Sequence, residues 1–166
     1  ADPPSPELEN ADWIKPGKAA WSYFHDKATS RSYETILEFN KQLDDLGYDF
    51  SLIDSGWRKW SLTESTAIRK VKNVIKQKPE SVDIWVWKSI EMGPFIPLYR
   101  QWLLKKLQSI GVVGVKLDHI ETETQWTINV YRRFLEDAAK HKLMVIYHNP
   151  NKPTGLTRTY PNMLSR

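Results

Sequence analysis

The sequence of residues 111–120 constrains the fold of this chain most strongly. It runs Gly-Val-Val-Gly-Val-Lys-Leu-Asp-His-Ile, so residues 112–117 form a short, almost continuous apolar stretch. Such a stretch is typical of a parallel strand that is covered on both faces. Lys116 interrupts the stretch and Asp118 follows it. Because side chains two residues apart point to the same face of a strand, a cation and an anion share one side near its carboxyl end.

This pair of charges has two interpretations. Charges on a buried strand are energetically costly unless they pair with each other or contact a ligand. Lys116 and Asp118 could therefore form a structural ion pair at a strand end. They could equally belong to a binding site, because the carboxyl ends of strands form the ligand-binding rim when helices close a sheet. The spacing alone does not decide between these interpretations.

Strand and helix patterns alternate along the whole chain. Strict alternation predicts right-handed crossovers and a parallel sheet. No Gly-x-Gly-x-x-Gly follows the first strand and no phosphate loop is present, which disfavours a nucleotide-binding fold. The predicted strands are residues 18–24, 48–53, 82–87, 112–117 and 143–147, and the predicted helices are residues 32–46, 65–76, 95–109 and 124–141.

The predicted fold class is α/β, with a partial (β/α)8 barrel that comprises about the first five β/α units. A whole barrel takes about 250 residues, whereas this chain has 166. We therefore expect residues 15–166 to be the N-terminal part of a (β/α)8 barrel that continues beyond Arg166. Residues 1–14, which are polar and rich in proline at their start, are expected to be a lead segment from a preceding domain. A polar loop is expected after residue 147.

The helix patterns also predict which side chains face the core. Apolar residues recur at intervals of three and four, which marks the buried face of an amphipathic helix. The inward residues are predicted to be Ile36, Leu37, Leu43 and Leu46 in the first helix, Ile68, Val71 and Ile75 in the second, Leu98, Trp102 and Leu107 in the third, and Trp126, Val130, Phe134 and Ala138 in the fourth.

Composition narrows the function classes. The absence of cysteine excludes disulfides and thiolate metal sites, and no stretch suggests a membrane span. The net charge of +4 is modest, and the densest group of bases lies on one predicted helix. A solvated helix face explains that group better than a nucleic-acid surface. We therefore predict neither a nucleic-acid nor a membrane partner. The eight tryptophans suit either sugar-binding clefts or a packed core.

Polar and aromatic residues gather at the predicted strand ends. This combination, without arginine clusters or glycine-rich loops, favours a neutral, ring-shaped ligand with many hydroxyls over a phosphorylated one. A lone histidine at such a place is more often a satisfied polar residue than a ligand, and Asp54 could simply brace the turn at Gly56. The strand-end residues are Trp21, Tyr23, Asp54, Trp57, Trp87, Lys88, Lys116, Asp118, His148 and Asn149.

Five segments together resemble a known enzyme family. They are residues 13–21 (Trp-Ile-Lys-Pro-Gly-Lys-Ala-Ala-Trp), 52–57 (Leu-Ile-Asp-Ser-Gly-Trp), 115–118 (Val-Lys-Leu-Asp), 138–145 (Ala-Ala-Lys-His-Lys-Leu-Met-Val) and 152–162 (Lys-Pro-Thr-Gly-Leu-Thr-Arg-Thr-Tyr-Pro-Asn). In this order they are similar to glycoside hydrolase family 97. The resemblance implies a TIM-barrel catalytic domain of an α-glucosidase or α-galactosidase that acts on α-linked hexosides and oligosaccharides. It also implies a calcium-dependent protein that is secreted or periplasmic.

The resemblance suggests roles for several residues. Retaining members carry an aspartate nucleophile where this chain has Asp118, with Lys116 beside it. Inverting members instead use two glutamates, whose positions fall near Lys88 and at Asn149, where this chain has no carboxylate. The resemblance thus implies a retaining mechanism, in which Asp54, Trp57, Trp87, His148 and Asn149 join Lys116 in binding substrate.

The remaining catalytic parts are expected outside this chain. In the family, the general acid/base and a calcium ligand are glutamates that would lie beyond Arg166, and we expect no metal site within these residues. The chain alone is therefore expected to be inactive. The alternative is a half-barrel without catalytic activity that binds carbohydrate or associates with itself through open barrel edges.

Overall fold

A computed structural model of the chain describes residues 2–4, 6–24 and 32–165. These residues fall into two units. The first, which we call the β2 unit, holds residues 17–87 and 109–113. The second, the β4 unit, holds residues 1–16, 88–108 and 114–166. Residues 1 and 5 of the predicted lead segment lie outside the described residues.

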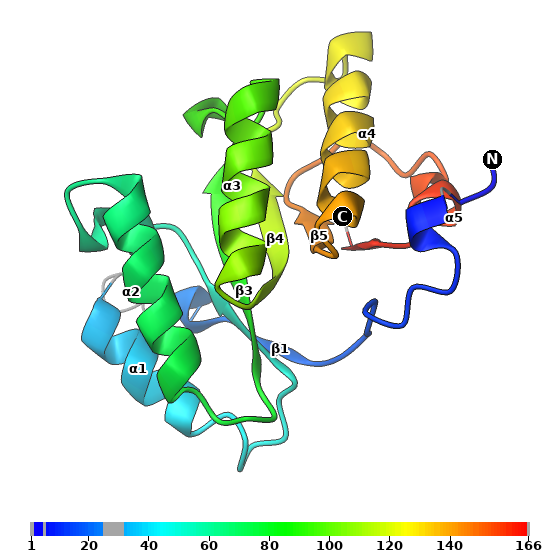
Figure 1. The fold of residues 1–166 in the computed structure, drawn as a ribbon. Coiled ribbons are helices and arrows are strands. Elements are labelled where there is room, and N and C mark those ends of the chain that lie inside the picture. The colour runs from blue at the N-terminus through cyan, green and yellow to red at the C-terminus, as the bar shows by residue number, and fades with distance from the viewer. Residues whose placement is uncertain (1, 5, 25–31, 166) are drawn as a thin grey trace. The chain divides into compact units, whose positions relative to one another are not determined.

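The β2 unit is a parallel sheet with two helices. Its strands are β1 (Ala19–Ala20), β2 (Phe50–Ile53) and residues 83–87 of β3 (Asp83–Ser89), and neighbouring strands pair in parallel in chain order. The helices α1 (Tyr33–Lys41) and α2 (Glu64–Gln77) pack side by side in Figure 1. A short 3-10 helix, η2 (Ser22–Phe24), follows β1, and another, η4 (Trp57–Trp60), follows β2.

The β4 unit repeats this pattern. Residues 114–117 of β4 (Val112–Asp118) pair in parallel with β5 (Met144–Tyr147), which pairs in parallel with β6 (Met163–Ser165). Its helices in Figure 1 are α3 (Pro97–Ser109), α4 (Gln125–Lys140) and the single turn α5 (Leu156–Thr159). The 3-10 helices η1 (Pro6–Leu8) and η5 (Ile90–Met92) complete the unit, and η1 contacts α4 through a segment in which Leu8 is buried.

Hydroxyl side chains cap the start of three helices. Ser32, Thr63 and Thr124 are the N-cap residues of α1, α2 and α4, and each side chain accepts a hydrogen bond from the backbone N–H three residues later. Such caps satisfy N–H groups that the first turn of a helix leaves without partners. The sequence therefore fixes the starts of these helices locally.

The alternation of helices with parallel strands, in chain order within each unit, confirms the α/β prediction. This is the arrangement of consecutive β/α units in a (β/α)8 barrel. The predicted strands and helices recur with bounds shifted by a few residues, apart from the first strand. β1 is only two residues long, so Trp21 and Tyr23 lie after it in and near η2, where their rings stack at 5.5 Å.

Some predicted core residues are exposed. Leu98 is 86% exposed because α3 buries the face that carries Leu103, Leu104 and Leu107, and Leu98 lies on the other side. Trp126 lies on the same face of α4 as Val130, but it occupies the first turn of the helix and is 55% exposed. Leu46 is exposed because α1 ends at Lys41, before the predicted pattern does. The predictions for these three side chains are wrong.

The segment after residue 147 is not only a loop. It contains α5 and the strand β6, in which Met163 is buried. These elements are too short for a hydrophobic period to develop, so the sequence pattern does not reveal them.

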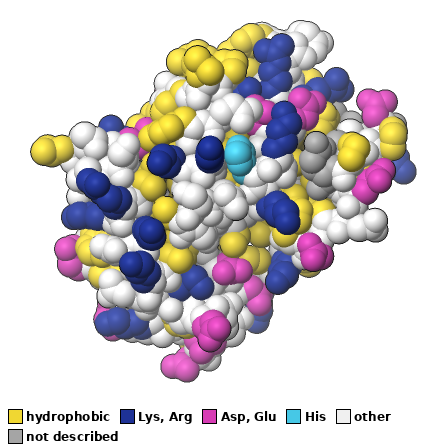
Figure 2. Space-filling model, viewed as in Figure 1, with side chains coloured by type: hydrophobic (Ala, Val, Ile, Leu, Met, Phe, Trp, Pro, Cys, Tyr) yellow, Lys and Arg dark blue, Asp and Glu magenta, His cyan; other side chains and the backbone are white. Residues whose placement is uncertain are grey.

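The basic residues of α2 lie at the surface of the protein. Lys70 lies over the Tyr33 ring at 5.1 Å, and Arg69, Lys72 and Lys76 are exposed. On the face shown in Figure 2, Lys and Arg side chains are dispersed among acidic and apolar ones. Among the described residues, none of the helices has both the length and the apolar character that a membrane span requires.

Candidate active site

The carboxyl end of β4 carries the two charges that the sequence singles out. Lys116 and Asp118 are both buried. Lys116 pairs in register with Ile146 of β5, and Leu117 with Tyr147. The backbone N–H of His148 then donates to the carbonyl oxygen of Leu117, at 2.9 Å. This parallel register brings His148 next to Asp118.

The carboxylate of Asp118 accepts hydrogen bonds from both strand ends. Its Oδ1 lies 3.0 Å from Nδ1 of His148 and 2.7 Å from the backbone nitrogen of His119. An ionised carboxylate accepts hydrogen bonds and cannot donate them, so Nδ1 of His148 is the donor in this contact. Charge-assisted hydrogen bonds of this kind are strong and directional. They hold one oxygen of Asp118 in place at the end of β4.

Both strands end in an unusual backbone conformation. His119 has a φ angle of 61° and Asn149 one of 50°, which is the left-handed region. Residues other than glycine occupy this region infrequently, and such residues concentrate at functional sites. The turn at His119 directs its backbone N–H back to the side chain of Asp118.

Two further residues near this site, His119 and Ser89, were not predicted. Nδ1 of His119 lies 3.1 Å from Oγ of Ser89, at the end of β3, and the same oxygen accepts the backbone N–H of Glu91. Lys88, which is also buried, has its Nζ 5.1 Å from the centre of the Tyr99 ring. No period or motif marks His119, because its position depends on where the strand turns.

The other predicted site residues belong to the β2 unit. Asp54 follows β2, is buried, and accepts the backbone N–H of Ser55 through Oδ1 at 2.6 Å. Trp57 is only 1% exposed, and its indole N–H donates to the carbonyl oxygen of Trp87 at 2.7 Å. Trp87 is buried as well. These two rings pack in the core, which leaves little ring surface for a ligand. Their predicted contact with substrate stays a prediction.

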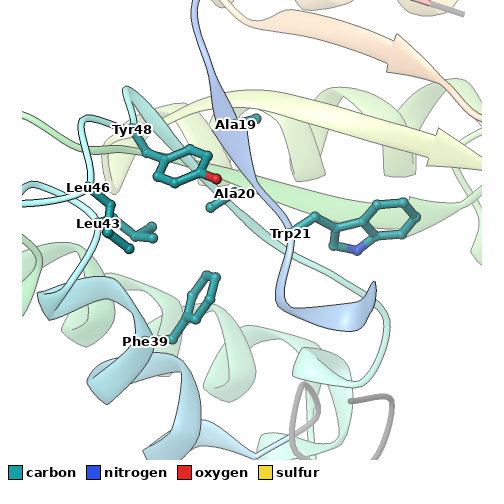
Figure 3. Close-up of a pocket in the computed structure, with 7 residues that line it drawn as sticks. All are labelled: Ala19, Ala20, Trp21, Phe39, Leu43, Leu46 and Tyr48. Carbon is teal, nitrogen blue, oxygen red and sulfur yellow. The ribbon is translucent and has the colours of Figure 1, made fainter. Parts of the chain in front are cut away.

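The β2 unit also contains an apolar cavity of about 540 Å³. Figure 3 shows that Phe39 of α1 and Leu43, which follows α1, line it together with Ala20 of β1, and that Tyr48 lies on the side opposite Phe39. Among the described residues that line it, none has a carboxylate, imidazole or amine. It therefore offers shape but no acid–base or nucleophilic chemistry.

A calcium ion would need a cluster of oxygen ligands, typically six to eight. Within the part of the chain that the structure describes, no three His, Asp or Glu side chains are arranged to hold a metal ion. The described residues by themselves therefore do not fit a calcium site.

Comparison with known proteins adds to this geometry. A family model described as Glycoside hydrolase 97 matches residues 13–166. A probable retaining alpha-galactosidase from Streptomyces bingchenggensis is 23% identical over 177 residues, which cover 98% of this chain and 27% of that protein. A retaining alpha-galactosidase from Bacteroides thetaiotaomicron is 23% identical over 175 residues, or 95% of this chain and 25% of that protein. The chain thus spans about a quarter of the curated relatives it matches.

Solved structures resemble the fold. A glycoside hydrolase family 97 enzyme from Pseudoalteromonas sp. strain K8, in complex with acarbose, has a TM-score of 0.74 and 19% identity, covering 97% of this chain and 30% of that one. A variant of that enzyme in complex with panose has a TM-score of 0.71 and 18% identity, with the same coverage. A beta-arabinopyranosidase has a TM-score of 0.69 and 26% identity, covering 88% of this chain and 24% of that one. These likenesses support the partial-barrel fold.

Proposed function

Because the chain belongs to the glycoside hydrolase 97 family, we propose that it carries part of the catalytic barrel of a retaining glycoside hydrolase that cleaves α-linked hexosides. The carboxylate of Asp118, buried at the end of β4 and held by His148 and His119, carries this proposal. Two curated relatives that are named retaining alpha-galactosidases support it.

The proposed reaction has two steps. An oxygen of Asp118 attacks the anomeric carbon, and a general acid protonates the leaving oxygen as the glycosidic bond breaks. Water, deprotonated by the same group, then attacks the glycosyl ester and releases the carboxylate. Retaining enzymes place their two carboxyl groups about 5–5.5 Å apart. We assign the acid/base to a glutamate that the family resemblance places after Arg166.

The chain's own residues orient this nucleophile. The hydrogen bond from His148 fixes one oxygen of Asp118, and Lys116 supplies positive charge on the same side of β4. Binding of sugar hydroxyls is assigned to Lys116, His148 and Asn149 in the β4 unit. The predicted contact of Asp54 with substrate stays a prediction. The predicted contacts of Trp57 and Trp87 with substrate stay predictions, and both rings are buried in the β2 unit.

The residues at two positions argue against an inverting mechanism. An inverting enzyme needs a general base that activates water. The positions where the family resemblance implies such glutamates fall near Lys88 and at Asn149, and neither side chain can take a proton from water as a carboxylate does. A retaining mechanism through Asp118 therefore fits these residues better.

Further properties of the complete protein belong to the same proposal. Its substrates would be α-galactosides or α-glucosides, including oligosaccharides, because solved relatives are described in complex with acarbose and panose. A calcium ion would be held mostly by residues outside this chain. The family resemblance also suggests a secreted or periplasmic enzyme.

Chemical rescue tests the proposed nucleophile. In the full-length protein, Asp118→Gly should abolish turnover of an activated aryl α-galactoside or α-glucoside. Added azide should restore cleavage and give a glycosyl azide of inverted configuration, because the small anion fits beneath the anomeric carbon. Asp45→Ala, at an exposed carboxylate after α1, is the matched control and should leave turnover unchanged. Full activity of Asp118→Gly would refute the assignment.

If the unmutated full-length protein bound these sugars without cleaving them, the chain would instead be a carbohydrate-binding half-barrel. The enzyme proposal therefore predicts turnover that depends on Asp118, whereas the binding alternative predicts affinity alone.

A further inference from the structure

The β4 unit contains a pocket that is lined by His119, the residue after the proposed nucleophile. It has a volume of about 330 Å³ and lies between the segment that follows β3 and the segment that follows β4. We call it the loop pocket. It is lined by Ile90, Glu91, Phe95, His119, Glu121 and Trp126, together with neighbouring residues. The function proposed above does not assign it a role.

Two aromatic rings of the loop pocket are unusually accessible. Phe95 is 43% exposed and Trp126 is 55% exposed. Their ring centres are 6.4 Å apart, and the ring planes are tilted by 58°. Met92 and Ile96, on the same loop as Phe95, are exposed as well. Such clustered apolar exposure next to a pocket marks a place where something binds.

The loop that carries Phe95 has a defined shape. Gly93 has a φ angle of +105°, and a Cβ atom there would lie 2.9 Å from Cδ1 of Tyr99. The Tyr99 ring in turn lies near the buried ammonium group of Lys88. Arg100 donates through Nη1 to the carbonyl oxygen of Pro94 at 3.1 Å. These contacts fix the loop against α3, so the rings are held in place before a ligand arrives.

The polar groups of the loop pocket select a neutral ligand. Glu91 and Glu121 present carboxylates, which accept hydrogen bonds from hydroxyl groups and repel anions. The pocket is at the small end of the range of about 300–1,000 Å³ that ligand sites span. Flat aromatic faces, hydrogen-bond acceptors and this volume suit one pyranose ring, whose C–H face is apolar and whose edge carries hydroxyls.

His119 connects the loop pocket to the proposed nucleophile. His119 lines the pocket, while its backbone N–H donates to Asp118. We propose that the loop pocket binds a second pyranose unit of an oligosaccharide, next to the unit that Asp118 attacks. This inference rests on the proposed function and deepens it, because it assigns the enzyme a preference for substrates longer than one sugar.

Substrate length tests this assignment. Trp126→Ala in the full-length enzyme is compared with the unmutated enzyme on a glycosyl fluoride and on a disaccharide. For a galactosidase these are α-galactosyl fluoride and melibiose. For a glucosidase they are α-glucosyl fluoride and maltose. The variant should raise KM for the disaccharide about three- to tenfold, as expected for the loss of one aromatic contact. It should leave kcat/KM for the fluoride unchanged, since the fluoride has no second sugar. Trp126→Phe should retain part of the affinity.

Leu98→Ala is the matched control, because Leu98 is an exposed apolar side chain near the start of α3 that does not line the pocket. It should change neither KM for the disaccharide nor kcat/KM for the fluoride. An unchanged KM for the disaccharide in both Trp126→Ala and Phe95→Ala would overturn the inference. So would an equal loss on both substrates.

Direct binding separates this inference from the proposed function. If the unmutated protein cleaves neither substrate, the proposed function fails, and saturation-transfer NMR of melibiose and maltose still tests the loop pocket. Weaker sugar signals with Trp126→Ala than with Leu98→Ala would support it. Equal signals in the two variants, or none with the unmutated protein, would overturn it.

Discussion

At the residue scale, the contact between His148 and Asp118 is the most informative feature of the site. The two side chains come from neighbouring strand ends, and Nδ1 of His148 lies 3.0 Å from the carboxylate. A hydrogen bond to a charged group contributes about 1.5–3 kcal/mol. We infer that His148 is a positioning residue, which keeps the attacking oxygen aligned in addition to any contact it makes with sugar.

Replacement of His148 tests this role. His148→Ala should lower kcat/KM by about 10- to 100-fold, because the lost hydrogen bond is worth that much in rate. His148→Asn should recover part of the loss, since the amide nitrogen of Asn can occupy the place of Nδ1. If His148→Asn were as slow as His148→Ala, the hydrogen bond would not explain the effect.

Sequence reasoning located part of this site and not the rest. Asp118 and Lys116 could be placed on one side of a strand end, because side chains alternate along a strand. The meeting of Asp118 with His148 depends on the register between β4 and β5, which no sequence period specifies. Trp57 and Trp87 are buried, and a tryptophan in a cleft has the same sequence pattern as one in the core.

At the element scale, one buried ion pair joins α3 to α4. Nε of Arg100 lies 2.7 Å from Oδ2 of Asp137, and both side chains are almost fully buried. Lys140 lies 3.2 Å from the other oxygen. Removing one member of a buried pair leaves the other charge without compensation in the interior, which destabilises a protein by about 3–5 kcal/mol.

Asp137→Ala should therefore lower the free energy of unfolding by about 3–5 kcal/mol. Glu38→Ala removes an exposed ion pair with Lys41 on α1 and should change it by less than about 1 kcal/mol. Chemical denaturation of the two variants and of the unmutated protein measures both values. Equal effects in the two variants would show that the Arg100–Asp137 pair contributes no more than a surface pair.

The same carboxylate makes stability depend on pH. Burial alone would raise the pKa of Asp137, but hydrogen bonds from Arg100 and Lys140 outweigh burial and hold this pKa below its ordinary value. The ionised form thus stabilises the folded state at any pH above the unfolded pKa of about 3.9. This contribution is lost as the pH falls through the lower, folded pKa. The difference in unfolding free energy between the unmutated protein and Asp137→Asn should narrow in that acidic range.

Elements differ in how well the sequence predicts them. The bounds of α2 and α4 follow from hydroxyl caps and a long apolar period, and both are local properties. The short elements β1, α5 and β6 are defined by their neighbours and not by their own residues. Exposure of Leu98 and Trp126 likewise depends on where each helix meets the core, which a period alone does not fix.

At the scale of the whole molecule, alternation was sufficient to predict the α/β class and the partial barrel. Each strand and the helix that follows it carry their own strand, turn and helix signals, so the fold could be predicted one strand–helix pair at a time. The proposed acid/base partner of Asp118 could not be placed in this way, because the chain spans about a quarter of its curated relatives. The full-length protein is therefore the molecule in which the central proposal must be tested.

That proposal is that Asp118 forms a covalent bond with the sugar. The most direct measurement is peptide mapping by mass spectrometry after the full-length enzyme reacts with a 5-fluoro-α-galactosyl or 5-fluoro-α-glucosyl fluoride, which slows hydrolysis of the glycosyl ester. We predict one added fluorosugar, on the peptide that contains residues 112–120 and at Asp118 itself. A label on another carboxylate, or turnover that proceeds with no trapped ester and gives a product of inverted configuration, would contradict it.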